Sequence, residues 1–243
     1  MAKQRTPDGP PPPPAVQKLR IQYARRGRLR YSSTRDFGRA LERALRRSGV
    51  PMAYSAGFHP HPKISYANGA ATGAASEAEY FEISVTERVD PDAVAAALDE
   101  ALPDGLDIVA AVEAQPGALA DRLQASRWLL RFPGAEPAEL DRAVEAFLAE
   151  ESVEVERMFK RGMKSYDARE PVMRAQTGID EDGCAILTMV VRHTTPAVRP
   201  DDVLRAISAV TSFAPPRSPI ATRLAQGIWS SETESVADPL AID

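Results

Sequence analysis

The sequence predicts an α+β fold made of two tandem ferredoxin-like (βαββαβ) domains. Two observations support this prediction: strand-like and helix-like segments follow one another in the order β-α-β-β-α-β, and that order occurs twice within the 243 residues. The length also suits two domains of about 100 residues each. We expect a disordered Pro-rich tail at residues 1–15, a basic domain at 16–115, a second domain at 124–229 and a disordered acidic tail at 230–243.

The first domain opens with a strand and a helix. Apolar and polar residues alternate over residues 17–23, which predicts a half-buried strand. Ser33 and Asp36 have the spacing of a capping box, and Gly49 is placed to end the helix that they begin. Between these signals, apolar residues recur at helical spacing and predict one buried helix face: Phe37, Ala40, Leu41, Ala44 and Leu45.

Three further strands and a second helix complete this domain. Asp90 is placed as an N-cap, and Pro91 is suited to the first helical turn that follows it. We expect strands over residues 63–67, 79–85 and 106–112, and a helix over residues 90–102.

The second domain repeats this order. Its helices are predicted from apolar residues at helical spacing and its strands from short apolar runs. We expect strands over residues 127–132, 152–160, 185–192 and within 220–229, and helices over residues 137–150 and 200–210.

Charge is distributed unevenly along the chain. The net charge is −4, but residues 1–75 carry 14 Lys or Arg against 3 acids, whereas residues 76–243 carry 16 against 31. A basic block on an otherwise acidic protein indicates a polyanion or an acidic protein surface as a partner. The alternative is a solvated helix face with no partner.

Nine arginines lie between residues 25 and 47, at the end of the first strand and on the first helix, with only Asp36 and Glu42 as acids among them. Guanidinium groups suit phosphate because their planar fork forms two parallel charge-assisted hydrogen bonds. Ion pairs within the helix are the structural alternative. We assign nucleic-acid or partner binding to Arg25, Arg28, Arg30, Ser33, Asp36, Arg39, Arg43, Arg46 and Arg47.

Residues 54–63, YSAGFHPHPK, form a candidate recognition loop. Glycine and two prolines predict a rigid, irregular loop, and its aromatic and cationic side chains suit single-stranded nucleic acid. Three alternatives remain open: a metal site using the two histidines, a general base at either histidine, or a turn held by the prolines. The candidate residues are Tyr54, Ser55, Gly57, Phe58, His59, His61 and Lys63.

Residues 157–170 contain five basic residues around Gly162, at what we expect to be a hairpin tip. The segment is either a second nucleic-acid contact or an exposed turn between strands. The candidate residues in it are Lys164, Asp167 and Arg169.

Several common chemistries have no motif in the sequence. We find no P-loop, no dinucleotide-binding fingerprint and no nucleophile elbow. Cys184 is the only cysteine, which excludes a disulfide, a cysteine-built zinc site and an iron–sulfur cluster ligated by this chain alone. No run of residues approaches the length of a membrane helix. We expect a cytoplasmic protein without a cofactor or metal.

Several motifs resemble a known family. They are RYSSTRD at residues 30–36, the long segment 39–67 with its central YSAGFHPHP, ASEAEYFEI at 75–83, KSYDAR at 164–169 and TRLAQG at 222–227. Together they resemble the radical-SAM-associated family of uncharacterised bacterial proteins. The resemblance implies a domain fused to, or encoded beside, a radical SAM enzyme. The family's usual gene neighbours, ribonuclease E/G and ribosomal proteins, imply RNA or a ribosome-related substrate.

One position departs from the family pattern. Thr34 stands where the family motif S-H-x-D typically has histidine. A mechanism that required that histidine would leave this protein inactive or dependent on another residue. His61, which lies inside the long central motif, is retained.

The leading functional prediction is a non-catalytic partner or substrate-recognition module for a separately encoded radical SAM enzyme, with RNA or a ribosome-related substrate held by the basic domain. A metal-independent ribonuclease is the first alternative, with His61 and either Lys63 or Tyr54 as acid–base and charge-stabilising groups. A protein-only adaptor, whose arginines contact an acidic protein, is the second.

Overall fold

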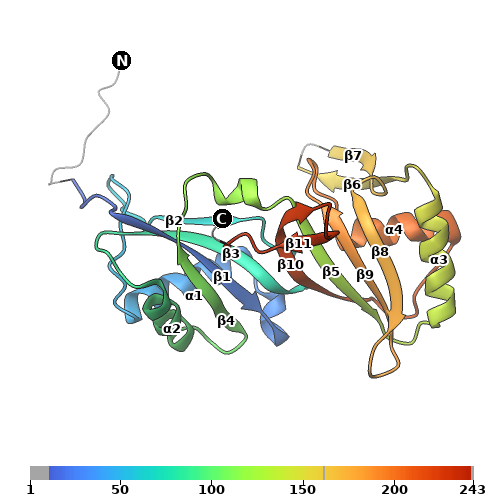
Figure 1. Cartoon of the computed structure of the whole chain (residues 1–243), viewed down its shortest axis with the longest axis horizontal. Helices are drawn as coiled ribbons and strands as arrows, with labels where there is room; N and C mark the ends of the chain where they lie inside the picture. Colours follow the sequence, from blue (N-terminus) through green and yellow to red (C-terminus); the bar gives the residue numbers. More distant parts are fainter. Residues whose placement is uncertain (1–10, 161, 242–243) are drawn as a thin grey trace, which may run out of the picture. The chain divides into compact units, whose positions relative to one another are not determined.

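The computed structural model describes residues 11–160 and 162–241 (Figure 1). Within them the protein is a mixed α+β structure with four α-helices and a large mixed sheet. It divides into two compact units. Unit 1 contains residues 11–73 and 77–120, and unit 2 contains residues 74–76 and 121–241. Residues 1–10 of the expected Pro-rich tail lie outside the described residues.

Unit 1 contains the elements that the alternating and helical patterns predict, together with a short 3-10 helix before α1. Its four strands and two α-helices follow one another along the chain in the order β-α-β-β-α-β. The bounds are β1 Gln17–Arg25, η1 Gly27–Tyr31, α1 Thr34–Arg47, β2 Ile64–Ala67, β3 Ala75–Val85, α2 Pro91–Ala101 and β4 Leu106–Glu113, followed by the 3-10 helix η2 Leu119–Arg122 at the division between the units.

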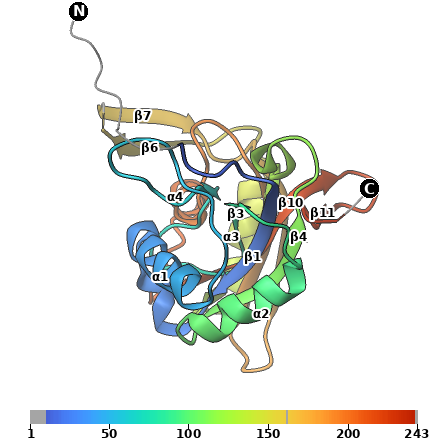
Figure 2. The ribbon, with the colours of Figure 1, turned by 90° about the vertical axis from the view of Figure 1, so that its left-hand side faces the viewer.

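The sheet of unit 1 has the strand order β4-β1-β3-β2. β1 pairs antiparallel with β4, and β2 pairs antiparallel with β3, where Ile64 lies opposite Ile83. Helices α1 and α2 contact each other and share one hydrophobic core with the strands (Figure 2). The rings of Tyr23 and Phe37 stack in this core with centroids 4.0 Å apart, so strand β1 is fixed against helix α1.

The predicted capping box at the start of α1 is confirmed. The backbone N–H of Asp36 donates to the Ser33 hydroxyl at 3.2 Å, and the Asp36 carboxylate accepts from the Ser33 backbone N–H at 3.2 Å. Asp90 caps α2 and Pro91 occupies its first turn, also as predicted. These signals are local in the sequence, which is why they predict the helix starts correctly.

Replacing Ser33 with alanine is expected to lower the free energy of unfolding by about 1 kcal/mol, because the Asp36 N–H loses its acceptor. Urea denaturation followed by far-UV circular dichroism measures this change. Ser33→Thr retains a capping hydroxyl and is the control. An alanine variant as stable as the threonine variant would show that the cap contributes nothing.

Unit 2 contains seven strands and two helices within its described residues. Their bounds are β5 Ala125–Phe132, α3 Pro137–Ala149, β6 Glu154–Phe159, β7 Gly162–Asp167, β8 Val172–Ile179, β9 Ala185–Arg192, α4 Pro200–Thr211, β10 Ile220–Ser230 and β11 Ser235–Ala237.

The main sheet of unit 2 has the strand order β10-β5-β9-β8, and each neighbouring pair is antiparallel. Ala75 and Ser76, at the start of β3, add a short parallel pairing with Thr222 and Arg223 of β10. The sequence prediction differs from the structure in one strand. Residues 152–160 were expected to join this sheet, but β6 pairs only with β7 in a separate two-stranded sheet.

The position in the main sheet that was expected for residues 152–160, next to β9, is occupied by β8. The sequence pattern did not predict this strand. β8 has few buried positions and contains Arg174, Gln176 and Thr177, because it lies at the end of the strand order and pairs with β9 alone. Such an edge strand lacks the apolar alternation on which the prediction depended.

Part of the expected acidic tail is ordered. β11 pairs antiparallel with β10, and Leu240 is buried beyond it. Gly227 permits this packing, since a Cβ at that position would overlap the carbonyl oxygen of Ala237. β11 therefore packs against β10 directly after the end of the TRLAQG motif at Gly227.

Within the described part of the chain, no helix is long and apolar enough to cross a membrane.

Candidate nucleic-acid interface

Helix α1 carries four exposed arginines on one face. Spacings of four, four and three residues place them on the same side of the helix, over roughly 17 Å of its axis. We call this set the arginine stripe: Arg35, Arg39, Arg43 and Arg46.

The arginine stripe is only partly neutralised. The side chains of Arg43 and Arg46 form no hydrogen bond or ion pair within residues 11–160 and 162–241. Asp36 is the nearby acid at the helix start, and its pKa is lowered chiefly by hydrogen bonds from Ser33 and further by the positive charges of Arg39 and Arg35. Asp36 already accepts hydrogen bonds from Ser33, and Glu42 is the other acid on the helix, so four arginines face two carboxylates and half of their positive charge stays uncompensated.

The short helix η1 adds basic and aromatic groups ahead of α1. Arg28 is exposed and has no hydrogen-bond or ion-pair partner among the described residues. The Arg30 guanidinium lies 4.8 Å from the centre of the Tyr31 ring and donates to the Tyr31 hydroxyl at 2.8 Å. Tyr31 is 61% exposed, so its ring is available for stacking.

Two other predicted or neighbouring arginines have internal partners. Arg26 pairs with Glu77 and with Asp107, and the hydrogen bond to Glu77 is the largest cause of its raised pKa. Arg47 donates to the carbonyl oxygen of Ala101. Arg26 and Arg47 are therefore partly satisfied by acceptors inside unit 1 and are less available to an external anion.

The loop of residues 54–63 is closed by its own backbone. Tyr54 pairs with Pro62 in an isolated β-bridge, and the Ser55 N–H donates to the His61 carbonyl at 2.8 Å. The Ser55 hydroxyl accepts from the His61 N–H at 3.0 Å. These contacts fix the base of the loop, while Phe58 at its tip is 61% exposed.

The remaining loop candidates follow this geometry. Gly57 has φ = +137°, a conformation that side chains other than glycine rarely adopt, and it allows the tight turn at the tip. His59 and Lys63 are exposed, and the Lys63 N–H donates to the Ala53 carbonyl.

Helix α1 and the loop line one groove of about 240 Å³. Arg46 lies on one wall, and Tyr54 and His61 lie on the other. The structure therefore brings one member of the predicted arginine set, Arg46, to the loop, and the other arginines do not line this groove. Glu42 also lines the groove and is the one acid there.

The KSYDAR segment in unit 2 is largely occupied by internal contacts. The Asp167 carboxylate accepts from the backbone N–H groups of Val153 at 3.0 Å and Arg169 at 2.8 Å. Partial burial opposes the charge of Asp167, but these amides and that of Glu170 outweigh burial and lower its pKa.

Arg169 lies over the Phe147 ring and donates to the carbonyls of Val172 and Leu148, both at 3.1 Å. Lys164 is exposed and contacts the ring of Phe159. Of the three candidates in this segment, only Lys164 presents its charge to solvent.

Asp167→Asn is expected to lower the free energy of unfolding by about 1–2 kcal/mol at pH 7, because a charged acceptor of two amides is lost. The folded-state pKa is depressed, so this contribution is present above the unfolded value of roughly 3.9 and is lost as the pH falls through the folded value. In urea titrations, the difference in free energy of unfolding between the wild type and Asp167→Asn should therefore be smaller at acid pH than at neutral pH. Glu181→Gln, at an exposed position, is the control, and a difference independent of pH would contradict the assignment.

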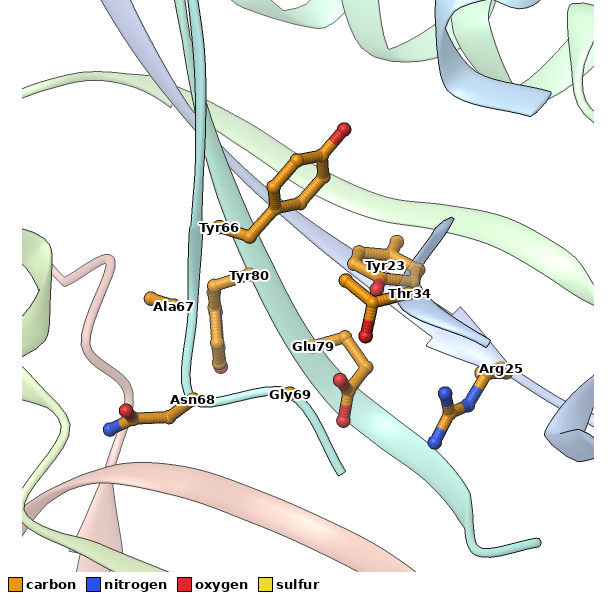
Figure 3. Close-up of a pocket in the computed structure, with 9 residues that line it drawn as sticks. All are labelled: Tyr23, Arg25, Thr34, Tyr66, Ala67, Asn68, Gly69, Glu79 and Tyr80. Carbon is orange, nitrogen blue, oxygen red and sulfur yellow. The ribbon is translucent and has the colours of Figure 1, made fainter. Parts of the chain in front are cut away.

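A second cavity, of about 120 Å³, lies at the start of α1 (Figure 3). Arg25, one of the predicted binding residues, reaches it from β1 but is only 3% exposed. Its guanidinium donates to the carbonyls of Ala70 and Ala71, both at 3.0 Å. The other polar residues that line the cavity come from three segments: Thr34, Tyr66, Asn68 and Glu79.

Glu79 was missed by the sequence analysis. It is only 1% exposed, and its carboxylate accepts from the Ala70 N–H at 3.0 Å. An acid inside the apolar run of residues 79–85 was the available signal, since carboxylates are seldom fully buried without a specific role. Thr34, noted only as a departure from a motif, lines the same cavity.

No group of three or more His, Cys, Asp or Glu side chains that could hold a metal occurs among residues 11–160 and 162–241. The cavity and the groove are lined by hydrogen-bonding, aromatic and positively charged side chains.

Comparison with known proteins places the chain in a group of unassigned function. Residues 18–200 match the sequence model of a protein family that is described as uncharacterised and conserved in bacteria. No curated protein matches the chain.

Proposed function

The chain belongs to the family of uncharacterised proteins conserved in bacteria, DUF2344, and on this premise we propose that it is a non-catalytic recognition module that binds single-stranded RNA through unit 1. The observation that carries the proposal is the arginine stripe on α1, which is exposed and places four arginines against two acids of the same helix, Asp36 and Glu42. Unneutralised guanidinium groups in a row bind a polyanion through its phosphates.

Aromatic side chains favour RNA over other polyanions. Tyr31 on η1 and Phe58 at the loop tip are each 61% exposed, and Tyr54 lines the groove beside Arg46. Exposed rings that accompany a basic surface are typical of single-stranded nucleic-acid binding, because unstacked bases lie against them. A surface that bound only acidic protein would not need these rings.

We further propose that each unit is a ferredoxin-like domain. The strand orders β4-β1-β3-β2 and β10-β5-β9-β8 support this, as do the antiparallel pairings and the two helices in each unit. In unit 2 the β6–β7 hairpin is then an insertion between α3 and β8.

The partner in this proposal is a separately encoded radical SAM enzyme. The support is the resemblance of the sequence motifs together with the cysteine count: Cys184 alone cannot ligate an iron–sulfur cluster, so a second chain would have to carry it. The RNA held by unit 1, or a ribosome-related RNA, is then the substrate of that enzyme.

Incubation of the purified protein with unstructured RNA tests the proposal. We expect RNA to bind and to remain intact over hours at neutral pH. Cleavage that disappears in His61→Ala while binding persists would replace the proposal with a ribonuclease. Binding of the neighbouring radical SAM enzyme without any RNA binding would replace it with a protein adaptor.

A further inference from the structure

The cavity at the start of α1 has the chemistry of a site for a neutral, planar, polar ring. Its lining contains one buried carboxylate, Glu79, and one buried guanidinium, Arg25, so the charges balance and neither a cation nor an anion is favoured. In Figure 3 the two groups point toward the same part of the cavity, and the Thr34 hydroxyl is directed into it beside Glu79. A ligand with a hydrogen-bond donor next to an acceptor suits this arrangement.

Aromatic rings line the cavity around these polar groups. Tyr23 and Tyr80 line it from β1 and β3, and Tyr66, which is 42% exposed, lines it from β2. The Tyr66 ring is held edge-on to Phe37 with centroids 5.9 Å apart, and Gly38 leaves room for its hydroxyl. A rigid, partly exposed ring beside a polar cavity is suited to contact a flat ligand.

The volume restricts the ligand to one ring. A cavity of roughly 150 Å³ in another protein accepts a benzene molecule, and this cavity has about 120 Å³. Because this cavity is smaller than that one, a single ring is the largest planar group that it can take, and a two-ring purine would have to remain partly outside.

We infer that the cavity binds the base of one unstacked cytosine of a single-stranded RNA. The Glu79 carboxylate accepts from the exocyclic N4 amino group, the pairing by which carboxylates recognise cytosine. The Thr34 hydroxyl donates to the neighbouring acceptor on the ring. Uracil presents a carbonyl oxygen in place of the amino group, which Glu79 would repel. This inference rests on the proposed RNA binding and adds to it a preference for one base.

The position of Thr34 connects the cavity to the arginine stripe. Thr34 is the first residue of α1 and Arg35 is the second, so the stripe begins beside the cavity and continues along the helix. An RNA strand whose phosphates follow the stripe can thus place one base in the cavity.

Binding of fluorescent oligocytidylate, oligouridylate and oligoadenylate of equal length at low salt tests this inference. We expect the wild-type protein to prefer oligocytidylate by about tenfold over each of the others. Thr34→Val keeps the shape of the side chain, removes its hydroxyl and should reduce the preference to less than about threefold. Glu79→Gln should also reduce the preference for oligocytidylate to less than about threefold. Because Glu79 is buried, the thermal unfolding of this variant must first be shown to match that of the wild type.

The outcomes separate the two claims. Equal binding of all three oligonucleotides, or an undiminished preference in Thr34→Val, would overturn the cytosine site and leave RNA binding intact. A preference for oligoadenylate would overturn the assignment of a single ring. Binding of none of them would overturn both the site and the proposed function.

Discussion

Replacing Arg39, Arg43 and Arg46 with glutamate is expected to abolish binding of single-stranded RNA at physiological salt. These residues form most of the arginine stripe and are exposed. Asp36 and Glu42 are the two acids on the same helix, and neither forms an ion pair with these arginines among the described residues. Each phosphate contact contributes about 0.7 to the slope of log affinity against log salt for a single strand, so the loss of three should reduce that slope by about two. Fluorescence anisotropy over a salt series measures both quantities.

A matched control lies in unit 2. Arg127, Arg142 and Arg217 are exposed and have no hydrogen-bond or ion-pair partner among the described residues. Replacing these three with glutamate changes the net charge by the same amount and should lower the affinity by less than about threefold. If both triple variants lose binding equally, the net charge of the protein and not the arginine stripe is responsible.

Loss of the Asp202 carboxylate is expected to have the largest effect on stability. Asp202 is fully buried, pairs with Arg157 and Arg205 and accepts from the Arg199 N–H at 2.9 Å. Asp202→Ala should lower the free energy of unfolding by about 3 kcal/mol, because it leaves the mostly buried Arg157 guanidinium without its carboxylate partner.

The same change should loosen the β6–β7 hairpin. Arg157 lies 4.7 Å from the centre of the Phe159 ring and 5.0 Å from that of Tyr166, and its pair with Asp202 ties this hairpin to α4. Burial is the main cause that raises the pKa of Tyr166 to about 12. Faster amide exchange in the hairpin of Asp202→Ala is therefore expected.

Asp201→Asn provides the control for this experiment, since Asp201 is the exposed neighbour on the same helix. It should change the free energy of unfolding by less than about 0.5 kcal/mol. Equal stability of Asp202→Ala and Asp201→Asn in urea titrations would contradict a structural role for the buried network.

Local signals in the sequence predict unit 1 well. The capping box at Ser33 and the N-cap at Asp90 depend on residues within one helical turn, so both helix starts could be predicted without tertiary information. β8 could not, because its polar residues are stabilised by pairing with β9 and not by their own pattern. Residues 152–160 were placed in the main sheet because the packing of β6 depends on contacts with α4 that are distant in sequence.

The site residues divide in the same way. The arginine stripe was visible because helical periodicity shows which arginines share an exposed face. Arg25 was grouped with them, yet it has the same strand parity as the buried Leu19, Ile21 and Tyr23, and the structure buries it. The cavity that contains Glu79 and Thr34 is lined by four segments of the chain, and no spacing in the sequence indicates that they lie together.

The measurement that tests the central claim most directly is the affinity of the wild-type protein for an unstructured RNA oligonucleotide at about 50 and 200 mM salt. Four phosphate contacts along the arginine stripe predict a loss of affinity of about fiftyfold between these salts. A loss of less than about threefold, equivalent to a single contact, or an absence of binding at both salts, would contradict the claim that the stripe holds RNA.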